Sequence, residues 1–175
     1  CLMRVPDQVG RCVSAMKQAV SVPVTVKCRI GVDDQDPGLA LGQLAAAVWE
    51  AGADGLWVHA RKAWLQGLSP RENREIPPLD YGRVYRLKRE NPSRFIGLNG
   101  GLRDPIHALD EIGRAAPALD GAMLGRAAYH NPQCLRDVDR LFHGSLAQPP
   151  QWADIIERMK EYSAGHIGRG GRLAH

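Results

Sequence analysis

The sequence predicts an α/β fold: the C-terminal half of a (β/α)8 TIM barrel, with four βα units, followed by the start of a helical domain. Four short apolar runs alternate with segments of helical periodicity. This alternation implies parallel strands joined by crossover helices, in either a barrel or an open doubly wound sheet. Polar residues at the carboxyl ends of the runs favour the barrel, whose strand ends meet at one mouth. Four strands cannot close a barrel, so the chain would supply half of one.

Each predicted strand is an apolar run that is too short for a helix and is bounded by Pro, Gly, Asp or Asn. The four runs cover residues 22–28, 55–59, 95–99 and 121–125. Apolar residues at helical spacing predict helices over about 9–20, 39–51, 81–90 and 104–115. Asp104 followed by Pro105 is a typical helix start, because aspartate caps the first turn and proline suits its first position.

The C-terminal part has a different pattern. A turn at Asn131-Pro132 precedes a predicted helix over about 133–142, and a new amphipathic helix begins near Trp152. The predicted domains are therefore 1–143, the second half of the barrel; 144–150, a linker; and 151–175, the beginning of a helical domain.

Composition excludes several classes of protein. Hydrophobic residues make up 44% and charged residues 24%, which excludes a disordered tail or a collagen-like fibre. No apolar run approaches the roughly 18 residues of a membrane-spanning helix, and no leader pattern occurs, so we expect a cytoplasmic protein without membrane contact. The 4 cysteines form no CxxC pair, which indicates reduced thiols and no metal site. The slight excess of 23 basic over 19 acidic residues permits a polyanionic partner without requiring one.

Two polar side chains in the apolar runs are candidates for ligand contact. Lys27 lies within the first run, where an unpaired lysine is costly to desolvate. It either faces an electron-rich ligand or reaches solvent at the strand end. His59 ends the second run and either bonds a backbone carbonyl in the core or donates to a ligand ring or phosphate.

Glycine-containing loops follow the third and fourth runs. Asn99, Gly100 and Gly101 follow one run, and Gly125 and Arg126 follow the next. Glycine lets backbone N–H groups approach phosphate oxygens, and arginine can donate to them in bidentate fashion. Each loop alone is most simply a turn, but two of them at consecutive strand ends favour a phosphate site.

The longest irregular segment is 63–80, which exceeds the usual βα loop of about 2–6 residues. Arg71 and Arg74 stand three residues apart in it, downstream of Trp64. Arginines beside an aromatic residue suit an RNA-facing loop, but a solvated surface loop explains the same charges.

Five strings in this order closely resemble the tRNA-dihydrouridine synthases. They are VTVKCRIG at 24–31, HARKAW at 59–64, LSPRENREIPPLDY at 68–81, NGG at 99–101 and MLGR at 123–126. The third string is the most specific and resembles the DusA branch, which acts on uridines 20 and 20a. The resemblance extends over essentially the whole chain.

The resemblance implies an FMN-containing barrel with a C-terminal helical domain. It implies reduction of the 5,6 double bond of uridines in the tRNA D-loop, with NADPH as reductant. FMN would carry the redox chemistry, and the protein would orient the uracil and supply a proton. The resemblance also implies roles for residues whose motifs match. Lys27 and His59 would contact the flavin ring, and Arg71 and Arg74 would contact tRNA. The phosphate of FMN would be bound by Asn99, Gly100, Gly101, Gly125 and Arg126.

The sequence departs from the family pattern in one respect that matters for catalysis. The family's proton-donor cysteine lies in an Asn-x-Gly-Cys-Pro motif, which is absent here, and Cys1 resembles a later cysteine. We therefore expect the catalytic cysteine upstream of residue 1 and no activity from this segment alone. We expect the full-length protein to be monomeric. We expect the isolated segment to self-associate through the unpaired edge strands of its sheet.

Three other interpretations remain open from the residues. One is an FMN barrel that reduces a small molecule, for which Arg71 and Arg74 would be unimportant. Another is a flavin-free barrel enzyme acting on a phosphate metabolite, with Lys27 as a Schiff-base or general-base candidate. The third is a non-catalytic RNA-binding protein derived from this fold.

Overall fold

The computed structural model describes residues 1–172 of the chain. The chain forms two compact units, Cys1–Gly125 and Arg126–His175. The first unit contains the sheet, and the described part of the second, residues 126–172, consists of helices and irregular backbone. The predicted domain boundary after residue 143 stays a prediction.

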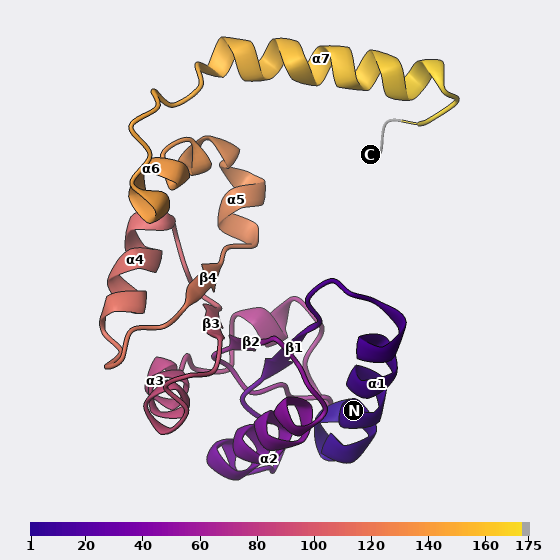
Figure 1. Ribbon diagram of the computed structural model, residues 1–175, viewed down its shortest axis with the longest axis vertical. Helices are drawn as coiled ribbons and strands as arrows, with labels where there is room; N and C mark the ends of the chain where they lie inside the picture. Colours follow the sequence, from indigo (N-terminus) through magenta and orange to yellow (C-terminus); the bar gives the residue numbers. More distant parts are fainter. Residues whose placement is uncertain (173–175) are drawn as a thin grey trace. The chain divides into compact units, whose positions relative to one another are not determined.

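A four-stranded parallel sheet forms the centre of the first unit (Figure 1). Its strands are β1 (Thr25–Arg29), β2 (Gly55–His59), β3 (Ile96–Asn99) and β4 (Gly121–Met123). They lie in the order β1-β2-β3-β4, so neighbours in the sequence are neighbours in the sheet. The predicted α/β class is confirmed, and this order is consistent with part of a barrel.

The strands are shorter than the apolar runs predict. β1 begins at Thr25 rather than at Val22, because Pro23 lacks the N–H group that a ladder needs. β3 begins one residue late, at Ile96, and β4 ends at Met123, two residues before Gly125.

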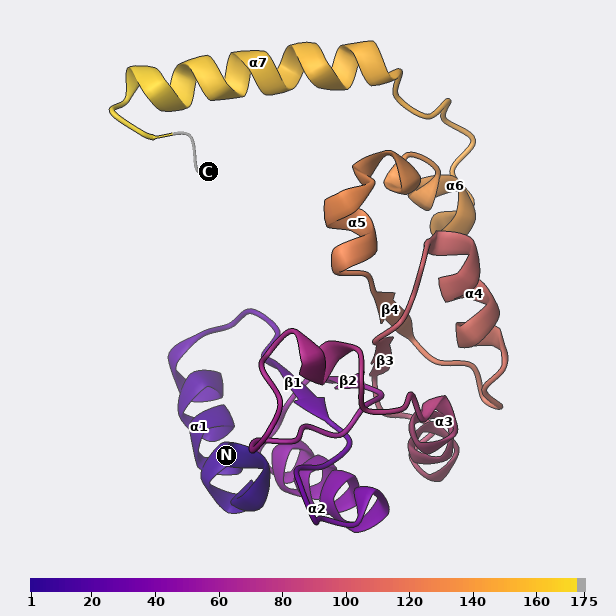
Figure 2. The same cartoon turned by 180° about the vertical axis from the view of Figure 1, so that it is seen from behind.

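Helices connect and precede the strands. They are α1 (Pro6–Ala19), α2 (Pro37–Glu50), α3 (Tyr81–Glu90) and α4 (Pro105–Gly113), with short 3-10 turns η1 (Leu2–Arg4) and η2 (Glu72–Arg74). Asp36, Asp80 and Asp104 each cap a helix, since their carboxylates accept backbone N–H groups of the first turn. The predicted cap at Asp104 is confirmed, with a 2.8 Å bond from the N–H of His107. α2 lies between α1 and α3 in both views (Figures 1 and 2).

The core of the first unit lies between the sheet and these helices. Every second side chain of β2 and β3 points to the helices, and Leu56, Val58, Ile96 and Leu98 are fully buried there. α2 contributes Leu41, Leu44 and Val48, and α3 contributes Val84. Each buried aliphatic side chain contributes about 1.5–3 kcal/mol of transfer free energy, so this face of the sheet is the one that holds the unit together.

The second unit contains α5 (Arg126–His130), η3 (Pro132–Leu135), α6 (Val138–His143) and α7 (Trp152–Gly168). The prediction of one helix over 133–142 was wrong, because a 3-10 turn and a separate short helix occupy that segment. Pro132 starts the turn, and α6 ends at Gly144 in the left-handed conformation (φ +63°). α5 was not predicted.

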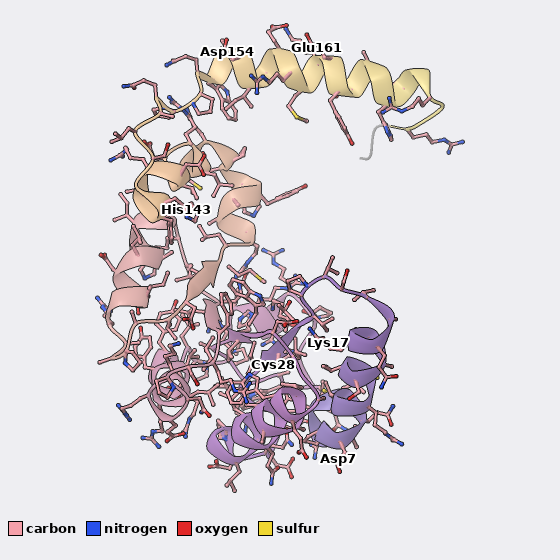
Figure 3. The ribbon with its side chains drawn as sticks, viewed as in Figure 1. Asp7, Lys17, Cys28, His143, Asp154 and Glu161 are labelled. Atoms are coloured by element: carbon pink, nitrogen blue, oxygen red, sulfur yellow. The ribbon has the colours of Figure 1, made fainter. Side chains whose placement is uncertain are left out.

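α7 is amphipathic, as its sequence pattern predicts. Asp154 and Glu161 project from one side of it (Figure 3). Apolar residues, including Ile155, Ile156 and Met159, line a groove on the opposite face. Within residues 1–172, no helix combines the length and the apolar character that crossing a membrane requires.

Candidate functional site

Strand register brings four residues into a row on the sheet face away from the helices. Arg29 pairs with His59, His59 with Asn99, and Asn99 with Met123. Register partners in a parallel sheet point to the same side, and their strand neighbours Val58 and Leu98 point into the helix-side core. We call Arg29, His59, Asn99 and Met123 the strand-end row. The structure thus brings together the predicted site residues His59 and Asn99.

A second row lies two residues earlier along each strand. It contains Lys27, Trp57, Gly97 and Gly121, and we call it the glycine row. A Cβ atom on Gly97 would lie 2.2 Å from Cε3 of Trp57, and one on Gly121 would lie 3.3 Å from Cη2. The six-membered ring of the indole therefore lies against both glycines. Phe95 meets it edge-on, with the ring centroids 5.2 Å apart. Trp57 thus forms an apolar floor next to the strand-end row.

Lys27 lies in the middle of β1, two residues before the strand ends. Its side chain belongs to the glycine row, beside Trp57. Desolvation, and then the charge of Arg29, lower the pKa of Lys27 below its usual value. Arg29, and not Lys27, is the cationic residue that lies with His59 in the strand-end row.

His59 carries an unused polar atom. Its Nε2 is buried, and no hydrogen-bond partner for it occurs among residues 1–172. Burial first, and then the charges of Arg29, Lys27 and Arg61, lower the pKa of His59 to about 4, against a smaller opposing effect of its hydrogen bond with Asn99. The imidazole is therefore neutral at pH 7. Because an unpaired buried nitrogen is costly, this atom is a candidate ligand contact.

Gly100 and Gly101 form a concave turn beside His59. Both have positive φ, +106° and +65°, a conformation that favours glycine. A Cβ atom on Gly100 would lie 3.0 Å from Nε2 of His59, and one on Gly101 would lie 2.5 Å from Cδ1 of Leu79. The Tyr81 hydroxyl donates to the carbonyl of Gly100 at 2.6 Å, which holds the turn in place. The positive φ values and these close contacts both favour glycine at the two positions.

The loop after β4 lies next to the loop after β3, because these strands are parallel neighbours. Asn99 joins the two strand ends, since its Nδ2 donates to the carbonyl of Met123 at 2.6 Å. A Cβ atom on Gly125 would meet no atom of the described chain within 4 Å, so its backbone is open to approach. Arg126 is the first residue of α5 and of the second unit.

Arg29 is a site residue that the sequence analysis did not single out. Its Nη1 donates to the carbonyls of Lys62 and Asn73 at 2.8 and 2.7 Å, both in the segment that follows β2. Desolvation, and then Arg74 and Arg61, lower its pKa below the usual arginine value. The signal was present in the sequence, because Arg29 lies two residues after Lys27 and must share its face of the strand.

The long loop, residues 63–80, is organised by a second residue that the sequence analysis did not single out. Asn73 is buried, and its Oδ1 accepts the N–H of Trp64 at 2.7 Å while its Nδ2 donates to the Trp64 carbonyl at 2.7 Å. Its Nδ2 also lies 3.3 Å from the carbonyl of Leu68. Arg61 donates through Nη1 to the carbonyl of Pro77. The loop therefore has a defined structure.

The predicted RNA contacts Arg71 and Arg74 are both exposed, on either side of the buried Asn73. Arg74 lies close enough to influence the pKa of Arg29. Arg74 of the long loop therefore adds positive charge near Arg29 of the strand-end row, which suits an anionic ligand or substrate.

All four cysteines are free thiols in the structure. Cys28 is buried on the core side of β1, and this burial raises the pKa of its thiol to about 12. A thiol with that pKa is neither a nucleophile nor a proton donor at pH 7. In the part of the chain that the structure describes, no group of three or more His, Cys, Asp or Glu side chains could hold a metal ion.

Comparisons with known proteins agree with this arrangement. Residues 1–175 match the model of the family described as Dihydrouridine synthase (Dus). The chain is 49% identical over 175 residues to a protein of Shewanella oneidensis, 46% over 176 residues to one of Vibrio cholerae, and 47% over 173 residues to one of Synechocystis. Each of these relatives is named tRNA-dihydrouridine(20/20a) synthase.

The matches cover 99–100% of this chain but only 51–53% of each relative, so the chain spans about half the length of the curated relatives it matches. The parallel α/β sheet, the glycine turn at its strand ends and the match over all 175 residues agree with one another. The chain belongs to the dihydrouridine synthase family.

Proposed function

We propose that this chain is the cofactor- and tRNA-facing half of an FMN-dependent tRNA-dihydrouridine synthase. The enzyme would reduce uridines 20 and 20a of the tRNA D-loop to 5,6-dihydrouridine, with NADPH as reductant. The names of the relatives support the reaction. The observation that carries the cofactor is the buried, unpartnered Nε2 of His59 beside the positive-φ glycines Gly100 and Gly101.

The residues present fit FMN. Lys27 and Arg29 would place positive charge at the polar edge of the flavin ring, and the neutral His59 would bond the ring region through Nε2. The backbone at Gly100, Gly101 and Gly125, together with Arg126, would hold the ribityl phosphate. Asn99 already joins the ends of β3 and β4 through the carbonyl of Met123. It would hold the two phosphate loops at a constant separation.

FMN, when bound, supplies the hydride chemistry of uracil reduction. The residues of this chain bind and orient. Trp57 closes the lower side of the site with an apolar surface, which excludes water from beneath it. His59 stays neutral, so it can donate or accept a hydrogen bond without adding to the positive charge of Lys27 and Arg29. The proton donor would be a cysteine in a part of the protein outside this sequence.

Arg71 and Arg74 would contact tRNA phosphates. Both are exposed, and their loop is held by Asn73, so binding would cost little loop entropy. Replacing Arg71 with alanine should weaken tRNA binding and lower the slope of log K against log salt by about 1. An FMN barrel that reduces a small molecule would be indifferent to this change.

We also propose that the sheet is half of a barrel. The sequential parallel order of β1–β4 and the half-length match to relatives support it. Chain outside this sequence would pair with the free edges of β1 and β4. The segment 144–150 would link the barrel to a helical domain that begins with α7.

The test is the visible spectrum of the protein purified from its complete gene. We expect an oxidised-flavin band, release of FMN on denaturation, and dihydrouridine in tRNA incubated with protein and NADPH. A protein that stays colourless after incubation with FMN would overturn the proposal. The phosphate-metabolite alternative would then be tested by adding borohydride together with a carbonyl substrate, which traps a Schiff base at Lys27, whose pKa is lowered.

A further inference from the structure

Trp64 is a large aromatic residue that the fold holds at the surface. Its side chain is 51% exposed, although tryptophan is normally among the more buried residues. Scattered exposed apolar residues are common and need no function. Trp64 differs from them in two respects. Hydrogen bonds hold its backbone and that of its two neighbours, and the residue lines a hollow.

Hydrogen bonds hold the backbone at and around Trp64. The side chain of Asn73 accepts the N–H of Trp64 and donates to its carbonyl, both at 2.7 Å. The N–H of Leu65 donates to Oδ1 of Asp33 at 2.7 Å, and the carbonyl of Ala63 accepts the N–H of Asp33 at 2.8 Å. Three consecutive residues are thus fixed from outside the segment. An aromatic ring on a fixed backbone binds a ligand at a low cost in conformational entropy.

The hollow beside the indole has polar walls. Its volume is about 440 Å³, and it is lined by Arg4, Asp33, Asp34, Trp64 and Gln66. Arg4 donates through Nη2 to Asp33 at 3.1 Å and to Asp34 at 2.8 Å, so the arginine offsets one of the two carboxylate charges of the wall. The exposed amide of Gln66 offers both a donor and an acceptor. One apolar plane with polar groups around it suits a flat, polar ring.

We propose that Trp64 and this hollow bind an unpaired nucleobase of tRNA, stacked on the indole, as a site separate from the strand-end row. The inference rests on the proposed function. The same loop carries the exposed arginines Arg71 and Arg74, whose side chains suit RNA phosphates. Stacking uses the π-face that every base has, so the site tolerates different bases.

The experiment uses the complete gene product with its flavin and unmodified tRNA. The variants are Trp64→Ala, Trp64→Phe and the control Leu65→Ala, whose side chain is similarly exposed at 53%. Trp64→Ala should raise Kd about tenfold or more, Trp64→Phe should raise it less, and Leu65→Ala should leave it unchanged. The salt slope of Trp64→Ala should equal that of the wild type, because no ionic contact is lost.

Fluorescence separates stacking from a structural effect. Addition of tRNA should quench the emission of the wild type more than that of Trp64→Phe, while both keep the same flavin absorbance. Equal Kd values for Trp64→Ala and Leu65→Ala would overturn the inference. So would equal quenching in the wild type and Trp64→Phe.

The assay also distinguishes this inference from the proposed function. If the wild type forms no dihydrouridine in tRNA, the proposed function itself fails. If the wild type forms dihydrouridine but Trp64→Ala binds tRNA as tightly, only the nucleobase site is wrong.

Discussion

Gly97 shows how one missing side chain shapes the site. Its hydrogen leaves the space in which the indole of Trp57 lies, and a Cβ atom there would be 2.2 Å from that ring. The indole cannot give way easily, because Phe95 packs against it. The floor of the site therefore depends on glycine at this position.

We expect Gly97→Ala to displace the Trp57 ring and to destabilise the protein by about 1–3 kcal/mol, as overpacking does. The control is Gly42→Ala in α2, where a Cβ atom meets nothing within 4 Å and where alanine should stabilise the helix by about 0.5–1 kcal/mol. Urea unfolding of the complete protein measures both. Equal effects of the two substitutions would contradict the close contact of Gly97 with Trp57.

His59 makes a prediction about pH. Its pKa is lowered to about 4 in the folded protein, so the folded state stays unprotonated while an unfolded histidine, with a pKa near 6.5, takes up a proton. The unfolded state therefore binds more protons between about pH 6.5 and 4, and the free energy of unfolding falls as the pH falls through this window. His59→Gln removes this contribution.

The measurement is urea unfolding of the complete protein and of His59→Gln at pH 7 and pH 5. The wild type should lose more stability than the variant on acidification, since all other titrating groups are shared. A loss of the same size in both proteins would show that His59 is not held neutral.

At the scale of elements, the long loop depends on Asn73 and Arg29. Asn73 bonds both backbone polar groups of Trp64, and its own carbonyl accepts from Arg29 at 2.7 Å. Arg29 belongs to the strand-end row of β1. These bonds connect the arginine-bearing loop to the sheet, so a change at Asn73 should alter the loop before it alters the core.

We expect Asn73→Ala to cost about 1–3 kcal/mol, because it removes the part-buried hydrogen bonds to both backbone polar groups of Trp64. Hydrogen exchange should show faster exchange at the Trp64 amide, with unchanged protection in β2 and β3. Asn91→Ala is the control: its side chain bonds one carbonyl, that of Leu87 at the end of α3, and should leave the loop unaffected. An unchanged exchange rate of the Trp64 amide in Asn73→Ala would contradict the idea that Asn73 holds the loop in place.

At the scale of the whole molecule, the chain exposes sheet edges and apolar surface. β1 and β4 are the outer strands of the described sheet. A hollow of about 350 Å³ beside β1 is lined mainly by apolar residues of η1, α1 and β1, among them Met3, Val13 and Val26. In the second unit, Ile156, Met159 and Ile167 of α7 are exposed. Such surfaces are normally covered.

We therefore predict that the 175-residue chain alone self-associates and reduces no uridine, whereas the complete protein is monomeric and active. Sedimentation velocity over a range of concentrations compares the two. A dilute-solution monomer of the isolated chain, stable over days, would contradict the idea that these surfaces need the rest of the protein.

Much of this protein follows from local sequence patterns. The alternation of strands and helices, the Asp104 cap and the positions of His59 and Asn99 at strand ends were predictable, because propensity, capping and strand length depend on residues close together in the chain. Pro132 and the short turn after it show the limit of this, since one helix was predicted where η3 and α6 lie.

The tertiary structure alone decided which residues share the site. Arg29 and His59 are 30 residues apart, and only the register of β1 with β2 makes them neighbours. The close contact of Trp57 with Gly97 likewise depends on the pairing of β2 with β3. The hydrogen bonds of Asn73 to Trp64 depend on how the long loop folds back on itself. A sequence pattern states which face a side chain takes within its own element. Which other element it faces depends on packing of the whole sheet and its helices, and no local pattern encodes that.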